Sequence, residues 1–277
     1  MLTRPGSRDV LVLSGGAARG AVQVGMAQAL LSYGVQPAGF VGTSVGALNA
    51  TFLAARPTLD GVAELADRWR SLSAKDVFPG SYWTRIGHMV RHPASVYSSD
   101  GLSRLIGEWV SVRRLEELPL PVRVVTTHLA TGRAVYHECG DLARLLLAST
   151  ALPGIFDPVT LPDPVDGTGS PHVDGGVADL VPVAGSAALA PTRVFVLDAS
   201  VPVRLRRVRT PLDVLVASLA VAMRVRPPVD LGHGVEVHHL RAPDLGIRMN
   251  DFSQTREHLA LGRRVVDEAL AAAAAAA

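Results

Sequence analysis

Two short glycine-containing segments near the start of the chain could carry out acyl chemistry. The first, SGGAARG, runs from Ser14 to Gly20 and directly follows a short apolar run. The second, GTSVG, has the spacing of a G-x-S-x-G elbow, which turns sharply from strand to helix and exposes its serine hydroxyl. Gly42 and Gly46 permit the tight turn, and Ser44 stands where a helix N-terminus stabilises developing negative charge. The pattern predicts a nucleophile at Ser44; a serine that only caps the helix is the structural alternative.

The first segment offers backbone donors to an anion. Gly15, Gly16 and Ala17 precede a helical pattern, so their N–H groups can converge on a negative group with the helix dipole behind them. A nucleotide phosphate is disfavoured, because the glycines match neither G-x-G-x-x-G nor G-x-x-x-x-G-K-[ST]. We expect an oxyanion hole, which acyl transfer at Ser44 would require.

A nucleophilic serine needs a base, and two arrangements could supply one. Asp174, in HVDGG, ends a short predicted strand, and Gly175 and Gly176 after it let another backbone come close. Its carboxylate would need an apolar setting, because an unperturbed aspartate has a pKa near about 3.9. We favour Asp174, although an aspartate that caps a loop is a common structural role. The alternative is a Ser-His-Asp triad of Asp198 and a later histidine, namely His233, His238, His239 or His258.

The elements that would position these residues alternate between strand and helix. Residues 10–13 and 39–44 predict short buried strands, and residues 21–33 and 45–55 predict helices. This alternation predicts a three-layer α/β/α fold with a mainly parallel central sheet. The first two strands of such a sheet are often neighbours, so both glycine segments would open at the same edge.

The rest of the chain continues this alternation as one domain over residues 1–277. Further strands are expected at 122–129, 133–138, 193–200 and 235–241, and helices at 141–149, 212–223 and from 254 onwards. The segment 59–117 is helical but interrupted, and it could cover the site or pack against the sheet. The stretch 161–171, LPDPVDGTGSP, predicts a loop. The alanine tail, residues 271–277, would prolong the last helix and receives no function.

Taken in order, SGGAARG, GTSVG, ASTALPGIFDPV and DGG resemble the patatin-like phospholipases over roughly Val10 to Val183. The resemblance implies a lipid acyl hydrolase with a Ser-Asp dyad, in which Ser44 is the nucleophile and Asp174 the base. It also implies that the glycine-rich loop is the oxyanion hole, with Arg19 as its basic residue.

Three residues need separate comment. Ala17 stands where the family often has a third glycine, but its backbone N–H is retained. His128 stands where the family often carries an aspartate. His172 lies two residues before Asp174, hence on the same strand face, where it could tune or replace the base; a packed histidine is the more common role.

Composition limits the partners. The net charge is only +2 with a pI near 9.0, too weak a field to predict nucleic-acid binding. The single cysteine, Cys139, cannot form an internal disulfide, and no Cys/His spacing resembles a zinc site, so we expect a cytoplasmic protein with no metal or organic cofactor. No feature specifies an oligomeric state.

Contact with a membrane would be peripheral. The longest apolar stretch, Val214 to Met223, is shorter than the roughly 20 residues of a spanning helix. The basic segment Val203 to Arg209 could meet anionic headgroups, although a solvated charged face is the more common role. A lipid-binding module that has lost its chemistry is the non-enzymatic alternative.

Overall fold

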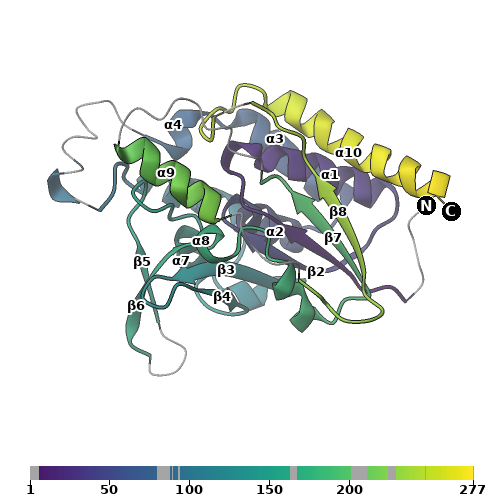
Figure 1. Ribbon diagram of the computed structural model, residues 1–277, viewed down its shortest axis with the longest axis horizontal. Helices are drawn as coiled ribbons and strands as arrows, with labels where there is room; N and C mark the ends of the chain where they lie inside the picture. The colour runs from purple at the N-terminus through teal and green to yellow at the C-terminus, as the bar shows by residue number, and fades with distance from the viewer. Residues whose placement is uncertain are drawn as a thin grey trace.

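A mixed β-sheet runs through the centre of the computed structural model (Figure 1). The structure describes residues 6–79, 88, 90–92, 94–162, 167–200, 211–223, 229–246 and 248–276. The strand order is β5-β6-β3-β2-β1-β7-β8, with β4 paired to β3 off this path. The parallel strands are β1 (Asp9–Leu13), β2 (Pro37–Thr43), β3 (Val122–His128), β7 (Arg193–Asp198) and β8 (Glu236–Arg241). Three further strands make antiparallel pairs. β4 (Arg133–His137) and β6 (Gly169–Asp174) pair with β3, and β5 (Val159–Pro162) pairs with β6.

Helices cover both faces of the sheet. The larger core contains Leu11 and Leu13 of β1 together with residues of α1 (Gly20–Ser32), α2 (Val45–Ala55), α3 (Leu59–Ser71), α6 (Asp100–Trp109), α7 (Leu142–Ser149) and α10 (Thr255–Ala276). The smaller core contains Val10 and Val12 and lies under the 3₁₀ helix η3 (Val183–Leu189). Because β1 alternates its side chains between two apolar layers, it is buried throughout. The three-layer α/β/α prediction is confirmed.

Short helices complete the layers. The helix α8 (Gly176–Asp179) follows β6, and α9 (Pro211–Ala222) lies near it in Figure 1. A Cβ at Gly176 would lie 2.6 Å from the side chain of Met223, which directly follows α9. The 3₁₀ helix η1 (Ala17–Arg19) leads into α1, α4 (Ala74–Val77) follows α3, and η2 (Leu115–Glu117) precedes β3.

The C-terminal helix α10 packs closely along α1 (Figure 1). A Cβ at Gly25 would lie 2.0 Å from the carbonyl oxygen of Leu259, and one at Gly262 would lie 2.0 Å from that of Val22. Only glycine permits this approach. The alanines up to Ala276 continue α10, as the sequence predicts.

The two ends of the stretch 161–171 depart from the predicted loop, and residues 163–166 lie outside the described residues. It contains the end of β5 and the start of β6, which pair antiparallel with Pro162 opposite Gly169. β5 is the edge strand at one end of this order, and an edge strand tolerates proline because a missing N–H costs no ladder hydrogen bond there. Proline at the end of β5 was therefore a misleading indication of a loop.

The strand β3 brings two strand ends together. β4 pairs with residues 124–128 of β3 and occupies one of its edges. β2 pairs with residues 122–125 and β6 with residues 126–128, so both must use the other edge. β2 runs parallel to β3 and β6 runs antiparallel, so their C-terminal ends meet where Thr43 faces Val125 and Asp174 faces Thr126. This junction positions the candidate site.

Candidate active site

Ser44 lies in a strained turn between β2 and α2. Its φ of 56° and ψ of −129° are unusual for a residue with a side chain. A Cβ at Gly46 would lie 2.4 Å from the carbonyl oxygen of Leu13, and one at Gly42 would lie 2.5 Å from that of Gly46. Both glycines are therefore needed for the elbow to pass its neighbours.

A buried serine outside the predicted site holds this elbow. The backbone N–H of Ser44 donates to Ser149 Oγ at 2.9 Å, and that hydroxyl donates to the carbonyl of Val125 at 2.6 Å. Ser149 therefore ties the elbow to β3. Sequence reasoning did not assign it a role, and its only signal was its place in ASTALPGIFDPV.

Asp174 meets Ser44 directly. Ser44 Oγ donates to Asp174 Oδ2 at 2.7 Å, and the Gly176 N–H donates to Oδ1 at 2.7 Å. The carboxyl is completely buried, and this burial raises its pKa to about 6, although both hydrogen bonds act in the opposite direction. Such a carboxylate is a stronger base than an exposed one and lies within reach of a hydroxyl proton.

The two glycines after Asp174 have steric roles. A Cβ at Gly175 would lie 2.3 Å from the carbonyl oxygen of Val125, and one at Gly176 would lie 2.8 Å from a methyl of Leu180. Gly175 thus lets the turn after β6 pass against β3, while Gly176 contributes its N–H to the carboxylate.

The loop after β1 presents backbone N–H groups near Ser44. The Gly15 N–H donates to the carbonyl of Leu180 at 2.9 Å, whereas those of Gly16 and Ala17 have no acceptor among the described residues. Ala17 has a φ of 51°, in the left-handed region that favours glycine. The Arg19 N–H donates to the carbonyl of Gly16 at 3.1 Å and so closes the loop at the start of α1.

An apolar cavity opens over Ser44. Its lining is almost entirely apolar and includes Trp69, Phe78, Leu105, Phe156 and Phe252. Three of these residues come from the segment 59–117, which both packs on the core and forms a wall of the cavity. This lining suits an apolar group.

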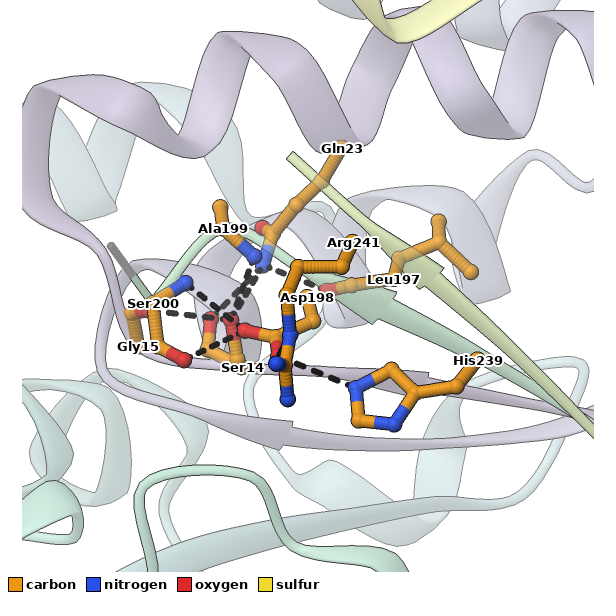
Figure 2. Close-up of polar contacts among 9 residues, drawn as sticks. All are labelled: Ser14, Gly15, Gln23, Leu197, Asp198, Ala199, Ser200, His239 and Arg241. Carbon is orange, nitrogen blue, oxygen red and sulfur yellow. Dashed lines mark hydrogen bonds and ion pairs between the residues drawn. The ribbon is translucent and has the colours of Figure 1, made fainter. Parts of the chain in front are cut away.

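The carboxylate of Asp198, at the end of β7, lies in a different environment (Figure 2). It accepts hydrogen bonds from the Ser200 N–H at 2.9 Å, His239 Nε2 at 2.9 Å and Arg241 Nε at 3.2 Å, and also from the Ser200 hydroxyl. Burial alone would raise the pKa of Asp198, but the hydrogen bonds from His239 and Ser200, with the charge of His239, outweigh burial and lower it. Asp198 and His239 therefore form a pair, but Ser44 does not belong to it. The reason is that Asp198 ends β7 and Ser44 follows β2, and β1 lies between these two strands.

The other late histidines also lie apart from Ser44. His238 Nε2 is 2.8 Å from Glu236 Oε1, and His233 is exposed. His258 is buried on α10, and burial lowers its pKa. Within the described ranges, neither Ser44 nor Asp174 has a hydrogen bond to a histidine.

Three histidines, on β3, β4 and β6, have local partners. His172 Nδ1 lies 2.8 Å from Thr126 Oγ1, and its Nε2 lies 3.2 Å from Ser170 Oγ. Thr126 Oγ1 is also 2.8 Å from His137 Nε2, and burial lowers the pKa of His137 to about 4. His128 Nδ1 lies 2.9 Å from Thr131 Oγ1 in the turn between β3 and β4. These contacts favour packing roles.

Comparison with known proteins identifies the family. A family model described as patatin-like phospholipase matches residues 11–186. The chain belongs to this family.

Two curated relatives agree with this assignment, and one solved structure shares the fold. Patatin-like phospholipase domain-containing protein 7 of Rattus norvegicus is 30% identical over 70% of this chain, which spans 14% of that protein. A lysophospholipase of Aspergillus terreus is 28% identical over 68% of the chain, which spans 12% of it. The crystal structure of VipD from Legionella pneumophila has a TM-score of 0.50 and 15% identity, covering 97% of this chain and 67% of VipD. The likeness to VipD shows a shared fold.

The described residues offer neither a metal cluster nor a membrane-spanning helix. In the described part of the chain, no group of three or more His, Cys, Asp or Glu residues is arranged to hold a metal ion. Over the same ranges, the structure contains no helix with the length and apolar character needed to cross a membrane.

Proposed function

We propose that this patatin-like chain hydrolyses acyl esters of lipids, as a phospholipase A-like esterase with a Ser44–Asp174 dyad. The hydrogen bond of 2.7 Å from the Ser44 hydroxyl to a completely buried carboxylate carries this proposal. Family membership supports the class of reaction, and the apolar cavity over Ser44 fits an acyl chain.

In the proposed reaction, Ser44 Oγ attacks the ester carbonyl carbon while its proton passes to Asp174 Oδ2. The tetrahedral oxyanion is held by the N–H groups of Gly16 and Ala17, while Gly15 shapes the loop. Collapse of this intermediate releases the alcohol, which takes the proton from Asp174, and leaves the acyl group on Ser44. Water then attacks the acyl-serine and gives a proton to Asp174. The fatty acid leaves as that proton returns to Ser44 Oγ.

A fluorophosphonate probe tests the nucleophile. The probe should attach to Ser44, with the site located by mass spectrometry, and Ser44→Ala should abolish labelling while the protein stays folded. The same two proteins should be compared for fatty-acid release from a panel of phospholipids, lysophospholipids and simple esters. Lipid binding without release of fatty acid would contradict hydrolysis and favour a binding module.

We extend the proposal to peripheral contact with an anionic lipid surface. The predicted basic segment Val203 to Arg209 lies outside the described residues. Support comes from α9, which follows it and exposes Val214 and Val221, half of each side chain being accessible. These positions lie seven residues apart and therefore on one helix face.

Vesicle sedimentation tests this contact. Val214→Ser with Val221→Ser should weaken binding to vesicles that contain phosphatidylglycerol. Val237→Ser is the matched control, because Val237 is 46% exposed but lies on β8. Equal binding by the double variant and the control would remove α9 from the proposal.

A further inference from the structure

A buried serine directly precedes the glycines of the loop after β1. Ser14 is completely buried, and its Oγ donates to the carbonyl of Gly15 at 2.9 Å. The same Oγ accepts the Ala199 N–H at 2.8 Å, from the turn after β7 (Figure 2). The Ser14 hydroxyl therefore joins the loop to a neighbouring strand end.

The bond to Gly15 has a consequence for the next residue. The carbonyl of Gly15 and the N–H of Gly16 belong to one planar trans peptide and point in opposite directions. A hydrogen bond that holds this carbonyl therefore sets the direction of the Gly16 N–H. It also polarises the peptide and makes that N–H a better donor.

The side chain of Gln23 fixes the preceding peptide. Its Nε2 donates to the carbonyl of Ser14 at 2.7 Å and to that of Leu197 at 3.2 Å, as Figure 2 shows. Its Oε1 accepts from Asn49 Nδ2 at 3.0 Å, and Asn49 Oδ1 accepts from Trp69 Nε1 at 2.9 Å. Gln23 and Asn49 are both completely buried, so this network is shielded from water.

Together these bonds hold three of the four polar groups in the two peptides that flank Gly15. Gln23 holds the Ser14 carbonyl, Leu180 accepts the Gly15 N–H, and Ser14 Oγ holds the Gly15 carbonyl. The remaining group is the Gly16 N–H. Glycine has no side chain to restrict its backbone, so the loop needs such external restraints to keep one conformation.

We propose that Ser14 and Gln23 are positioning residues that direct the Gly16 N–H toward the oxyanion. This inference rests on the proposed hydrolysis at Ser44. Neither side chain need touch the substrate, since both act through the peptides around Gly15. A change in either should therefore lower kcat while leaving KM nearly constant.

Ser14→Ala and Ser186→Ala form a matched pair for the test. Ser186 is also completely buried, and its Oγ donates to the carbonyl of Val183 at 2.7 Å, within η3. Ser14→Ala should lower kcat by about 10- to 100-fold, less than the roughly 10²- to 10³-fold typical of losing a donor outright, with KM within about twofold. Ser186→Ala should keep both constants. Gln23→Met should lower kcat in the same direction as Ser14→Ala.

A crystal structure of Ser14→Ala gives a readout that does not depend on activity. The Gly15–Gly16 peptide should rotate or adopt two orientations, whereas in Ser186→Ala it should stay as described. An unrotated peptide, or a kcat equal to that of Ser186→Ala, would overturn the inference. If the wild-type protein releases no fatty acid, the proposed hydrolysis fails, but the peptide orientation still decides whether Ser14 directs the Gly16 N–H.

Discussion

Asp174 and Asp198 are two buried carboxylates that end strands of the same sheet, yet their surroundings differ in kind. Asp174 receives one hydroxyl and one backbone N–H, and burial raises its pKa to about 6. Asp198 receives donors from Ser200, His239 and Arg241. The bonds from His239 and Ser200 lower its pKa despite burial. Donor number therefore separates a carboxylate that can accept a proton from one that stays ionised.

Under the proposed function, the difference also separates a chemical role for Asp174 from a structural role for Asp198. The donors around Asp198 stabilise its charge and hold the turn that gives the Ala199 N–H to Ser14. Asp174 keeps a hydroxyl as its partner, and that hydroxyl borders the cavity. A Ser-His-Asp triad needs the serine to contact the histidine. The Asp198–His239 pair lies beside the glycine-rich loop but does not contact Ser44, so it forms no triad with that serine.

The largest expected effect is on turnover. Asp174→Asn should lower kcat for ester hydrolysis by about 10⁴-fold or more, because the amide cannot take the Ser44 proton. Asp198→Asn should keep kcat within about tenfold. Steady-state kinetics on one ester substrate measure both, with melting curves to show that each variant is folded. Equal losses in the two variants would break the comparison.

The pH dependence gives the next effect. Hydrolysis requires ionised Asp174, so kcat/KM should fall about tenfold per pH unit below a pKa of about 6. His239→Gln should show the same fall of kcat/KM at acidic pH, because His239 contacts Asp198 instead of Ser44. If the acidic fall of kcat/KM shifted to another pH or disappeared in His239→Gln, the Ser-His-Asp alternative would be favoured.

The two carboxylates should have opposite effects on stability. The folded pKa of Asp174 lies above its unfolded value near 3.8, so its ionised form costs stability at pH above about 6. Asp174→Asn should therefore raise the free energy of unfolding at pH 8 by up to about 2–3 kcal/mol. This gain should shrink as the pH falls through 6 toward 4. Chemical denaturation at pH 8 and pH 4.5 measures it, and a loss of stability at pH 8 would contradict the prediction.

Chemical denaturation of Asp198→Asn should show the opposite change in stability. Its folded pKa is lowered, so it contributes stability that is present above the unfolded pKa and is lost as pH falls through the folded pKa. Asp198→Asn should lower the free energy of unfolding at pH 8 by about 1–3 kcal/mol, since buried donors lose a charged partner.

The smallest expected effect concerns the loop that runs between the two carboxylates. Ala17→Gly should raise the free energy of unfolding by about 0.5–1 kcal/mol, because Ala17 has a φ of 51°. Ala190→Gly is the matched control, with a φ of 46° far from the loop in sequence. If Ala190→Gly raised the free energy of unfolding and Ala17→Gly did not, the backbone at Ala17 would not be strained despite its positive φ.

Much of the fold could be predicted because local patterns and tertiary structure agree. The helix at Val45–Ala55 and the strands around β1 and β2 follow directly from apolar periodicity and glycine boundaries. β5 and the start of β6 were not predicted, since Pro162 and Pro171 are typical of a loop and only long-range pairing shows that they belong to strands. Ser149 and Gln23 could not be singled out either, because a buried polar side chain acquires its partners only through folding.

By itself, the sequence determined the fold class, the family and the residue types that could react. Glycine spacing around Ser44 and after Asp174 is a local property, so it can be read without coordinates. Only the tertiary structure decided which carboxylate meets that serine. Both Asp174 and Asp198 end a strand, but β6 shares one edge of β3 with β2, whereas β7 is separated from β2 by β1. Strand order depends on long-range pairing, and burial and donor number, which set the two pKa values, depend on it in turn.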